Sequence, residues 1–329
     1  MSSLGVSFTD PVLEARVKAG VHEVERQLAE AVDSPETFVA EAAAHLLNAG
    51  GKRFRPLLVM LSAEFGDPAG PGVVPSAVVV ELTHLATLYH DDVMDEASMR
   101  RGAPSANARW GNSIAILVGD YLFAQASDLV SELGPEAVRI QARTFSRLVQ
   151  GQIRETLGPA EGDDALEHYL SVVADKTGSL IATAALFGAK MSGASEEIQV
   201  TLTEFGERIG AAFQLSDDII DIASETGDSG KTPGTDLREG VPTLPVLIAL
   251  RSTDVGSERL RSLLSKPLTD DAEHAEALTA LRGHPAMDEA RSYVHAEANA
   301  AQALLAKLPE CAAREALQAL SDTVATRLG

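Results

Sequence analysis

The sequence has little cysteine, few aromatic residues and no long apolar run. Cys311 is the single cysteine, which excludes an internal disulfide and a zinc cluster built from thiolates. Aromatic residues make up 4% of the chain, whereas alanine and leucine are abundant, and this balance favours helices over sheets. No uninterrupted apolar run reaches the ~18 residues that a membrane-spanning helix needs, and the first residues carry no secretion signal. We therefore expect a soluble, cytoplasmic protein.

Basic residues are also scarce. Lysine and arginine total 27 against 48 aspartates and glutamates, so the formal net charge is -21 at pH 7. A surface this acidic argues against non-specific nucleic-acid binding, which needs cations to neutralise phosphates. Any site for an anionic ligand must therefore be built from local basic residues or bound cations, against the field of the whole protein.

Helical periodicity runs through the whole chain. Apolar residues recur at helical spacing in residues 12–32 and 75–92, and the alanine-rich residues 271–327 continue the pattern. Glycine and proline pairs separate the periodic segments, and we find no internal repeat or break in composition. We predict an all-α fold with a single domain over residues 1–329. The longest irregular stretch, residues 224–242, has a length that is typical of functional loops.

Two aspartate clusters share one spacing. The first consists of Asp91, Asp92 and Asp95, and the second consists of Asp217, Asp218 and Asp221. Residues four apart lie one helical turn apart, so the outer two aspartates of each cluster share a face and the middle one flanks them. His84 stands seven residues before the first cluster and Gln214 one turn before the second, each on the face of its cluster.

The clusters predict a metal site. Three neighbouring carboxylates repel one another, and burying them unpaired costs several kcal/mol. A single cluster is also compatible with a solvated helix face, but both clusters lie in apolar helical segments, which indicates a compensating cation. Oxygen donors without a His/Cys set favour a hard ion, and magnesium prefers to bridge a few carboxylates to a substrate phosphate. We therefore expect all six aspartates to take part in binding Mg2+.

Basic residues stand beside the predicted site. Each of them alone is compatible with a solvated surface, but together, in so acidic a chain, they indicate a phosphate-binding site. They are Lys52, Arg53 and Arg55 after a Gly-Gly turn, Arg100 and Arg101 after the first cluster, Lys176 with Thr177 before an apolar segment, and Lys231 in the long loop.

Five motifs in this order resemble the trans-isoprenyl diphosphate synthase (polyprenyl synthetase) family. They are GGKRFRP (50–56), the first aspartate cluster with its histidine and arginines, KTG (176–178), FQLSDDIID (213–221) and GKTPGTDLREG (230–240). The resemblance implies a bundle of roughly ten or more helices around a deep apolar cavity, usually in a homodimer. It also implies magnesium-dependent, head-to-tail condensation of isopentenyl diphosphate with an allylic diphosphate, with three Mg2+ ions in each active site.

The resemblance assigns roles to individual residues. The principal magnesium ligands would be Asp91, Asp95 and Asp217, supported by Asp92, Asp218 and Asp221. The allylic diphosphate would be held by Arg100, Lys176, Thr177, Gln214 and Lys231, and the isopentenyl diphosphate by Lys52, Arg55, His84 and Arg101. The catalytic group would be the two clusters together with Lys176, Gln214 and Lys231. Many members carry a second loop lysine where this chain has Val241, and we expect that one phosphate contact to be weakened.

Product length depends on the residues beneath the first cluster. In members that make short products, the positions of Ala86 and Thr87 tend to carry Phe or Tyr, which close the floor of the pocket. Small residues there predict a long all-trans product, although they are also compatible with ordinary helix packing. On the predicted helix 120–129, Leu122 and Phe123 could still obstruct the tail, whereas Ser127 could not.

Three alternatives remain open from the sequence. The chain could be a short-chain synthase making farnesyl or geranylgeranyl diphosphate, a class I terpene cyclase, or a non-catalytic partner subunit. A cyclase normally lacks the second cluster and the GGKRxRP element, and partner subunits tend to lose one cluster. No amphipathic anchor is evident, so membrane contact for release of an apolar product would be transient.

Overall fold

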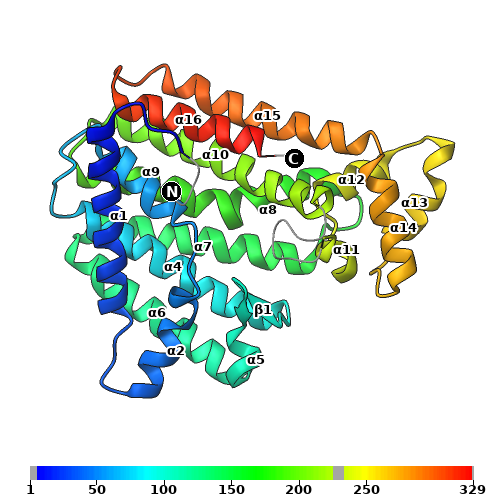
Figure 1. Ribbon diagram of the computed structural model, residues 1–329, viewed down its shortest axis with the longest axis horizontal. Coiled ribbons are helices and arrows are strands. Elements are labelled where there is room, and N and C mark those ends of the chain that lie inside the picture. Colours follow the sequence, from blue (N-terminus) through cyan, green and yellow to red (C-terminus); the bar gives the residue numbers. More distant parts are fainter. Residues whose placement is uncertain (1–5, 225–232, 328–329) are drawn as a thin grey trace. The chain divides into compact units, whose positions relative to one another are not determined.

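The computed structural model describes residues 6–224 and 233–327, and helices dominate this part of the chain (Figure 1). The all-α prediction is confirmed, with one two-stranded hairpin as an addition. Internal contacts divide the described residues into two compact units. Unit 1 contains residues 6–146, 180–206 and 304–320, and unit 2 contains residues 147–179, 207–224, 233–303 and 321–327.

The elements follow one another with short connections. In the first half they are α1 (Pro11–Ala31), α2 (Thr37–Asn48), α3 (Phe54–Ala63), α4 (Val73–Met94), β1 (Met99–Arg100), β2 (Ala103–Pro104), α5 (Ala106–Trp110), α6 (Asn112–Glu132) and α7 (Pro135–Leu157). In the second half they are α8 (Ala165–Val173), the π-helix η1 (Ala174–Gly178), α9 (Ser179–Met191), α10 (Glu196–Ala223), α11 (Thr235–Glu239), α12 (Leu244–Arg251), the 3-10 helix η2 (Val255–Ser257), α13 (Glu258–Leu264), α14 (Asp271–Arg282), α15 (Ala286–Leu305) and α16 (Ala312–Thr326).

Helix α1 shows how local sequence sets a helix boundary. The carboxylate of Asp10 accepts hydrogen bonds from the backbone N–H groups of Val12 at 2.7 Å and Leu13 at 3.2 Å, and Pro11 occupies the first turn. The Asp10 carboxylate thus supplies acceptors for backbone N–H groups that have no partner within the helix, and the fixed φ of Pro11 favours the helical conformation there. The predicted apolar stripe is buried at three of its four positions, Val17, Val24 and Leu28.

Helix α4 is the core helix of unit 1. It is buried on nearly every side, from Val73 to the first aspartate cluster at its C-terminal end, because its apolar residues do not alternate with a polar face. Helix α6 packs along it, and Gly119 permits the close approach because a Cβ there would collide with the imidazole ring of His90. The His90 Nε2 lies 3.1 Å from the carbonyl oxygen of Ile116, which links the two helices further.

A buried ion pair fixes the chain just before α3. Arg53 is 7% exposed and Glu81 of α4 is 2% exposed, and their charged atoms lie 3.3 Å apart. Arg53 also adopts a left-handed backbone with φ of 48°, and its guanidinium donates to the Leu47 carbonyl at 3.2 Å. Of the three cations in GGKRFRP, Arg53 therefore serves the fold, whereas Lys52 is exposed.

The hairpin of β1 and β2 carries the two arginines that follow the first cluster. Its two turn residues, Arg101 and Gly102, have φ of 53° and 75°, as a two-residue type I′ turn requires. Such a backbone costs roughly 1–2 kcal/mol at a residue with a side chain, so Arg101 needs compensating contacts. Its guanidinium supplies them by donating to the carbonyl oxygens of Leu46, at 2.9 Å, and Gly50.

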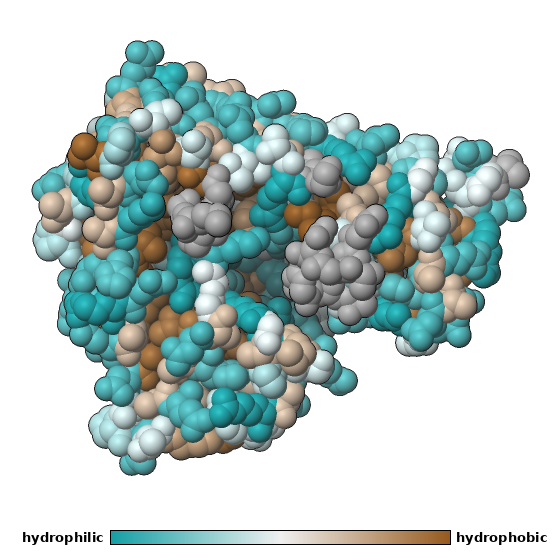
Figure 2. Space-filling view, in the orientation of Figure 1, coloured by the Kyte–Doolittle hydropathy of each residue, from teal (hydrophilic) through white to brown (hydrophobic). Residues whose placement is uncertain are grey.

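Two long helical stretches are apolar, whereas the face of the molecule in Figure 2 is mostly hydrophilic. Hydrophilic residues cover most of the face seen in Figure 2, and apolar residues form scattered patches. Two stretches, Asn112–Glu132 and Ala165–Met191, are long and apolar enough to cross a membrane by length and composition alone. The second is 61% buried inside the protein, as a core helix would be.

Replacing Glu81 by Ala should lower the free energy of unfolding by about 3 kcal/mol, because the buried Arg53 would keep only the more exposed carboxylate of Glu25, 3.4 Å from its Nε. Urea unfolding at equilibrium measures this. The control is Glu30→Ala, which removes a pair with Arg26 that is exposed on α1 and should leave the unfolding midpoint unchanged. Equal effects of the two substitutions would contradict the structural role of the buried pair.

Candidate functional site

The first aspartate cluster closes the last turn of α4 in unit 1. Asp92 is fully buried, and its Oδ1 accepts a hydrogen bond from Arg100 Nε at 2.6 Å. Arg100 also reaches toward Asp95, at 3.8 Å. Burial raises the pKa of Asp92, and the neighbouring Arg100 opposes that shift. The other carboxylate oxygen of Asp92 is buried without a hydrogen-bond partner in the described part of the chain.

Three of the residues predicted to bind isopentenyl diphosphate converge in unit 1. The charges of Arg55 and Arg101 both act on His84, and together with burial they lower the pKa of the imidazole well below its ordinary value. His84 is therefore neutral near pH 7. Burial also lowers the pKa of Arg55, to about 10, against the opposing charge of Glu81. The Nε of Arg55 is buried without a hydrogen-bond partner in residues 6–224 and 233–327.

The second aspartate cluster lies near the C-terminal end of α10 in unit 2. Asp218 is 5% exposed, and both of its oxygens accept hydrogen bonds, one from the Tyr169 hydroxyl and one from Gln214 Nε2 at 3.0 Å. Burial raises the pKa of Asp218 to about 6, and the two donors limit the shift. Asp217 is more open and forms an ion pair with Arg327, whose guanidinium also lies 4.3 Å from the centroid of the Phe213 ring.

Asp221, the last member of the second cluster, has a contact of its own. Its two carboxylate oxygens accept hydrogen bonds from the backbone N–H groups of Thr235 and Asp236, each at 3.3 Å, and its carbonyl accepts from Gly234 N at 2.8 Å. The far end of the long loop is thereby fixed to the cluster. Lys231, predicted to bind phosphate from this loop, lies outside the described residues.

The sequence suggested that the KTG motif begins an apolar helix, but in the structure it does not. It lies in η1, a π-helical turn that joins α8 to α9, so the three helices form one continuous stretch. Lys176 Nζ pairs with Glu155 of α7, and the Thr177 hydroxyl donates to Gln214 Oε1 at 3.1 Å. Unit 2 thus brings together three of the predicted allylic-site residues and the second cluster, because Gln214 contacts both Thr177 and Asp218.

The two clusters share a buried middle aspartate that is held by protein donors, while Asp91, Asp95 and Asp217 are at least partly exposed. The last member of the second cluster, Asp221, is partly exposed but is also held by backbone donors. Among the described residues, no group of three or more His, Cys, Asp or Glu side chains is gathered as a metal ion would hold them. The donor set still fits a hard divalent cation, since it consists of carboxylates, and the buried oxygen of Asp92 that lacks a hydrogen-bond donor favours a positive partner.

The predicted floor residues are small and tightly enclosed. Ala86 is fully buried, and Thr87 is 9% exposed with its hydroxyl donating to the His84 carbonyl at 2.8 Å. On α6, the ring of Phe123 lies 4.3 Å from that of Phe145 and 5.7 Å from that of His90, centroid to centroid. Phe123 therefore packs among rings within unit 1.

Sequence reasoning missed three residues that contact the predicted site. Tyr169 lies seven residues before Lys176 in an apolar helical segment, so the spacing offered a weak signal. Glu155 stands four residues after Gly151 in an ordinary amphipathic pattern, which does not distinguish it from the other charged residues of that segment. Arg327 lies 110 positions from Asp217 (327 − 217), and no local pattern indicates that contact.

Comparison with known proteins gives one consistent result. Residues 36–281 match the polyprenyl synthetase family. Nonaprenyl diphosphate synthase from Mycobacterium tuberculosis is 53% identical over 326 residues, which cover 99% of this chain and 97% of that protein. Heptaprenyl diphosphate synthase component 2 from Geobacillus stearothermophilus is 38% identical over 307 residues, 92% of this chain and 94% of the relative. The crystal structure of geranylgeranyl pyrophosphate synthase from Corynebacterium glutamicum, complexed with calcium and isoprenyl diphosphate, superposes with a TM-score of 0.89 at 48% identity, covering 98% of this chain and 100% of that one.

Replacing Arg100 by Met should destabilise the protein by roughly 3 kcal/mol, because the Asp92 carboxylate would stay buried without its cation. The double variant Asp92→Asn/Arg100→Met should recover most of this loss, since no uncompensated charge remains. Urea unfolding of wild type, both single variants and the double variant completes the cycle. Additive losses would show that the pair is not coupled.

Proposed function

Because the chain belongs to the polyprenyl synthetase family, we propose that it joins isopentenyl diphosphate head to tail to an allylic diphosphate and releases an all-trans polyprenyl diphosphate. The family makes it a prenyl-transferring enzyme of isoprenoid biosynthesis. The observation that carries the proposal is the pair of aspartate clusters, each with a buried middle carboxylate held by its own donors. The whole chain, residues 1–329, would act as one polyprenyl synthetase domain.

Magnesium is the cation that we propose for the clusters, with three ions in each active site. Asp91, Asp95 and Asp217 would be the principal ligands, while Asp92, Asp218 and Asp221 would orient them or bind through water. The partial exposure of the first three, and the donors already bound to the others, support this division. When bound, magnesium neutralises charge on the departing diphosphate.

The basic residues would divide between the two substrates. Arg100, Lys176, Thr177, Gln214 and Lys231 would bind the allylic diphosphate, and Lys52, Arg55, His84 and Arg101 would bind isopentenyl diphosphate. Their donor capacity supports the assignment, because Arg100 bonds Asp92 through Nε and can offer its terminal nitrogens to phosphate, and the Lys176 ammonium has more than one proton to donate besides its contact with Glu155. Neutral His84 would donate a hydrogen bond without repelling the arginines around it.

The proposed condensation requires stabilisation of negative charge and exclusion of water from the site, and it requires no general base from the protein. Arginine and lysine stabilise the negative charge that develops as the allylic C–O bond ionises. The alkene of isopentenyl diphosphate then attacks the allylic cation, and the proton lost afterwards goes to the released diphosphate. The loop that carries Lys231 would exclude water, which otherwise captures the cation.

A long product, of six to ten isoprene units, is the more favoured outcome. Ala86 and Thr87 offer no aromatic floor, and a relative that is 53% identical makes nonaprenyl diphosphate by name. The similar Corynebacterium enzyme is a geranylgeranyl pyrophosphate synthase, so a short product is the alternative.

The partner that we propose is a second copy of the chain. Helix α6 is apolar along its length but only 33% buried in its most apolar window, and Ile116 and Leu117 on it are 43% and 61% exposed. Covering such a helix with another copy would remove this apolar area from water. The dimer would be cytoplasmic, with transient membrane contact to release its product.

One relative favours a second candidate. The Geobacillus protein is component 2 of its synthase, so this chain could also need another subunit to be active. The test is to incubate the purified protein with Mg2+, labelled isopentenyl diphosphate and farnesyl diphosphate, and to identify products by mass. Chain extension by the chain alone supports the synthase. The absence of any product would contradict the one-component synthase in favour of the two-component form. A hydrocarbon made from farnesyl diphosphate alone would indicate a cyclase.

Replacing Ala86 by Phe should shorten the product by several isoprene units, because an aromatic ring would close the floor of the pocket five residues before Asp91. Mass spectrometry of the dephosphorylated products measures the length. Leu88→Phe enlarges a half-buried residue of the same helix outside the predicted floor and serves as the control. An unchanged length in Ala86→Phe, with activity retained, would refute the floor argument.

Replacing Tyr169 by Phe should weaken metal binding about tenfold, because Asp218 would lose the hydroxyl that orients it. The readouts are calorimetric titration with Mn2+ and the Mg2+ concentration that gives half-maximal rate. Tyr121→Phe is the matched control, since its hydroxyl donates only to the Asp33 carbonyl, at 3.0 Å. The same metal affinity in both variants would show that Tyr169 has no role in orienting Asp218.

A further inference from the structure

The KTG motif sits on an unusual piece of backbone. Residues Ala174–Gly178 form a π-helical turn between two α-helices, and Ser179 N–H donates to the Ala174 carbonyl across it. A π-turn holds one residue more than an α-turn and makes poorer hydrogen bonds, so its persistence needs support from outside. If the turn relaxed to α-helix, the side chains of Lys176 and Thr177 would rotate by up to ~100°, the angle of one helical residue.

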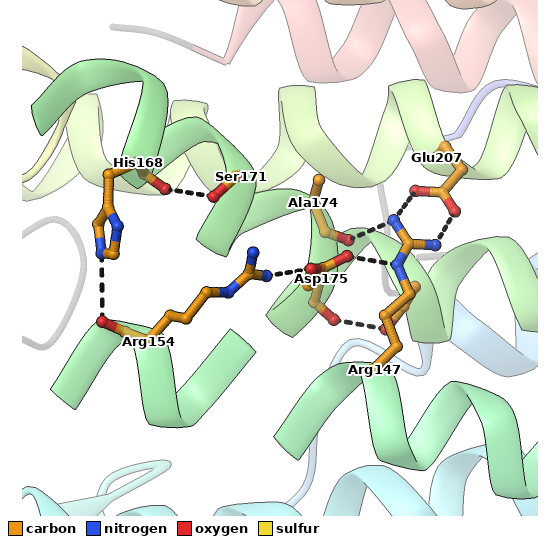
Figure 3. Close-up of polar contacts among 8 residues, drawn as sticks. Arg147, Arg154, His168, Ser171, Ala174, Asp175 and Glu207 are labelled. Carbon is orange, nitrogen blue, oxygen red and sulfur yellow. Dashed lines mark hydrogen bonds and ion pairs between the residues drawn. The ribbon is translucent and has the colours of Figure 1, made fainter. Parts of the chain in front are cut away.

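A charged cluster within unit 2 supports this turn, and we name it the Asp175 clamp: Arg147, Arg154, Asp175 and Glu207 (Figure 3). Arg147 and Arg154, both on α7, each donate to one carboxylate oxygen of Asp175 in the π-turn. Arg147 also forms a two-pronged pair with Glu207 of α10, one prong measuring 3.0 Å, and donates to the Ala174 carbonyl at 3.4 Å. The hydrogen bonds to Glu207 and Asp175 raise the pKa of Arg147, so the guanidinium keeps its charge.

The neighbouring glycines show that the fit is close. A Cβ on Gly151 would lie 2.8 Å from the backbone nitrogen of Lys176 and 3.1 Å from the Cβ of Asp175. A Cβ on Gly178 would lie 3.3 Å from Glu207 Oε2. Helix α7 therefore presents Arg147, Gly151 and Arg154 to the π-turn at spacings of four and three residues, as one helix face does.

The clamp and the predicted allylic-site contacts lie on the same two helices. Glu155, the partner of Lys176, stands one residue after Arg154, and Gln214, the partner of Thr177, stands two turns after Glu207. The clamp residues hold the backbone of the turn, whereas Lys176 and Thr177 present their side chains to different partners. This separation indicates that positioning and binding are carried by different residues.

We infer that Arg147, Asp175 and Glu207 are positioning residues of the allylic-diphosphate site, which hold η1 in its π-form so that Lys176 and Thr177 face the substrate. The inference rests on the proposed function, because it takes Lys176 and Thr177 as contacts of the allylic diphosphate. A purely structural salt-bridge cluster would lower stability without selecting between the two substrates. Loss of a positioning cluster, in contrast, weakens the binding of one substrate and leaves the binding of the other unchanged.

The test compares Arg147→Met with Arg208→Met in the full-length enzyme. Arg208 lies on α10 next to Glu207 and pairs with a different carboxylate, that of Glu297, at 3.0 Å, so it is the matched control. Arg147→Met should raise the KM for farnesyl diphosphate about ten- to a hundredfold, because a small displacement of a binding group has effects of that size. The KM for isopentenyl diphosphate should change less than twofold, and Arg147→Lys should recover part of the loss.

A second variant tests the same inference without removing a charge. Gly151→Ala places a methyl group against the backbone nitrogen of Lys176, so the π-turn must shift and allylic affinity should fall, whatever part of the cost the better helix propensity of alanine offsets in thermal stability. Calorimetric binding of a thiolo analogue of farnesyl diphosphate, whose C–S bond ionises poorly, measures that affinity without turnover. Equal KM changes for both substrates in Arg147→Met, or unchanged allylic affinity in Gly151→Ala, would overturn the inference.

Lys176→Ala separates this inference from the proposed function. Wild-type enzyme that fails to extend farnesyl diphosphate contradicts the proposed function itself. Active wild type with a raised allylic KM in both Lys176→Ala and Arg147→Met supports the positioning role. An allylic KM unchanged by Lys176→Ala would overturn the inference even in an active enzyme, since the clamp would then have no binding residue to position.

Discussion

The constraint on which this structure depends is the cost of placing carboxylates in apolar helices. Asp92, Asp175 and Asp218 each sit in such a segment, and each is held by a donor from another element of its unit. With 27 basic residues against 48 acidic ones, the chain has few cations to spare. Arg100 supplies the cation beside Asp92, and Arg147 and Arg154 supply the cations beside Asp175.

Local sequence predicted the helices and the positions of both clusters because these depend on spacing within a few residues. It also placed Arg100 near the first cluster, as a phosphate-binding residue, but it did not predict the contact with Asp92, to which a short hairpin returns the chain. The contact between Arg327 and Asp217 was beyond such reasoning, because it depends on packing between distant helices. The π-turn at Lys176 was missed for a similar reason, since its sequence is compatible with a regular helix and its neighbours enforce the wider turn.

One spacing serves two purposes in each cluster. In an α-helix, the first and last aspartates of D-D-x-x-D share a face, while the middle one is turned by about 100° toward the interior. The middle carboxylate is then turned toward protein donors, while the outer ones lie on the more exposed side of the helix. This explains how Asp92 and Asp218 are buried although their neighbours are not, and how the same motif works in two different surroundings.

The hairpin after α4 has a consequence for how this region tolerates change in chain length. Two consecutive arginines in this hairpin have different partners. Arg100 donates to Asp92, and Arg101 donates to the carbonyl oxygens of Leu46 and Gly50. Which arginine reaches which destination is set by counting residues from the end of α4, because both side chains have the same chemistry. An insertion or deletion of a single residue there would shift both arginines by one position, so that one destination would receive the other arginine and the other destination would lose its arginine. In this segment, a change in the number of residues should therefore disturb the structure far more than a conservative substitution does.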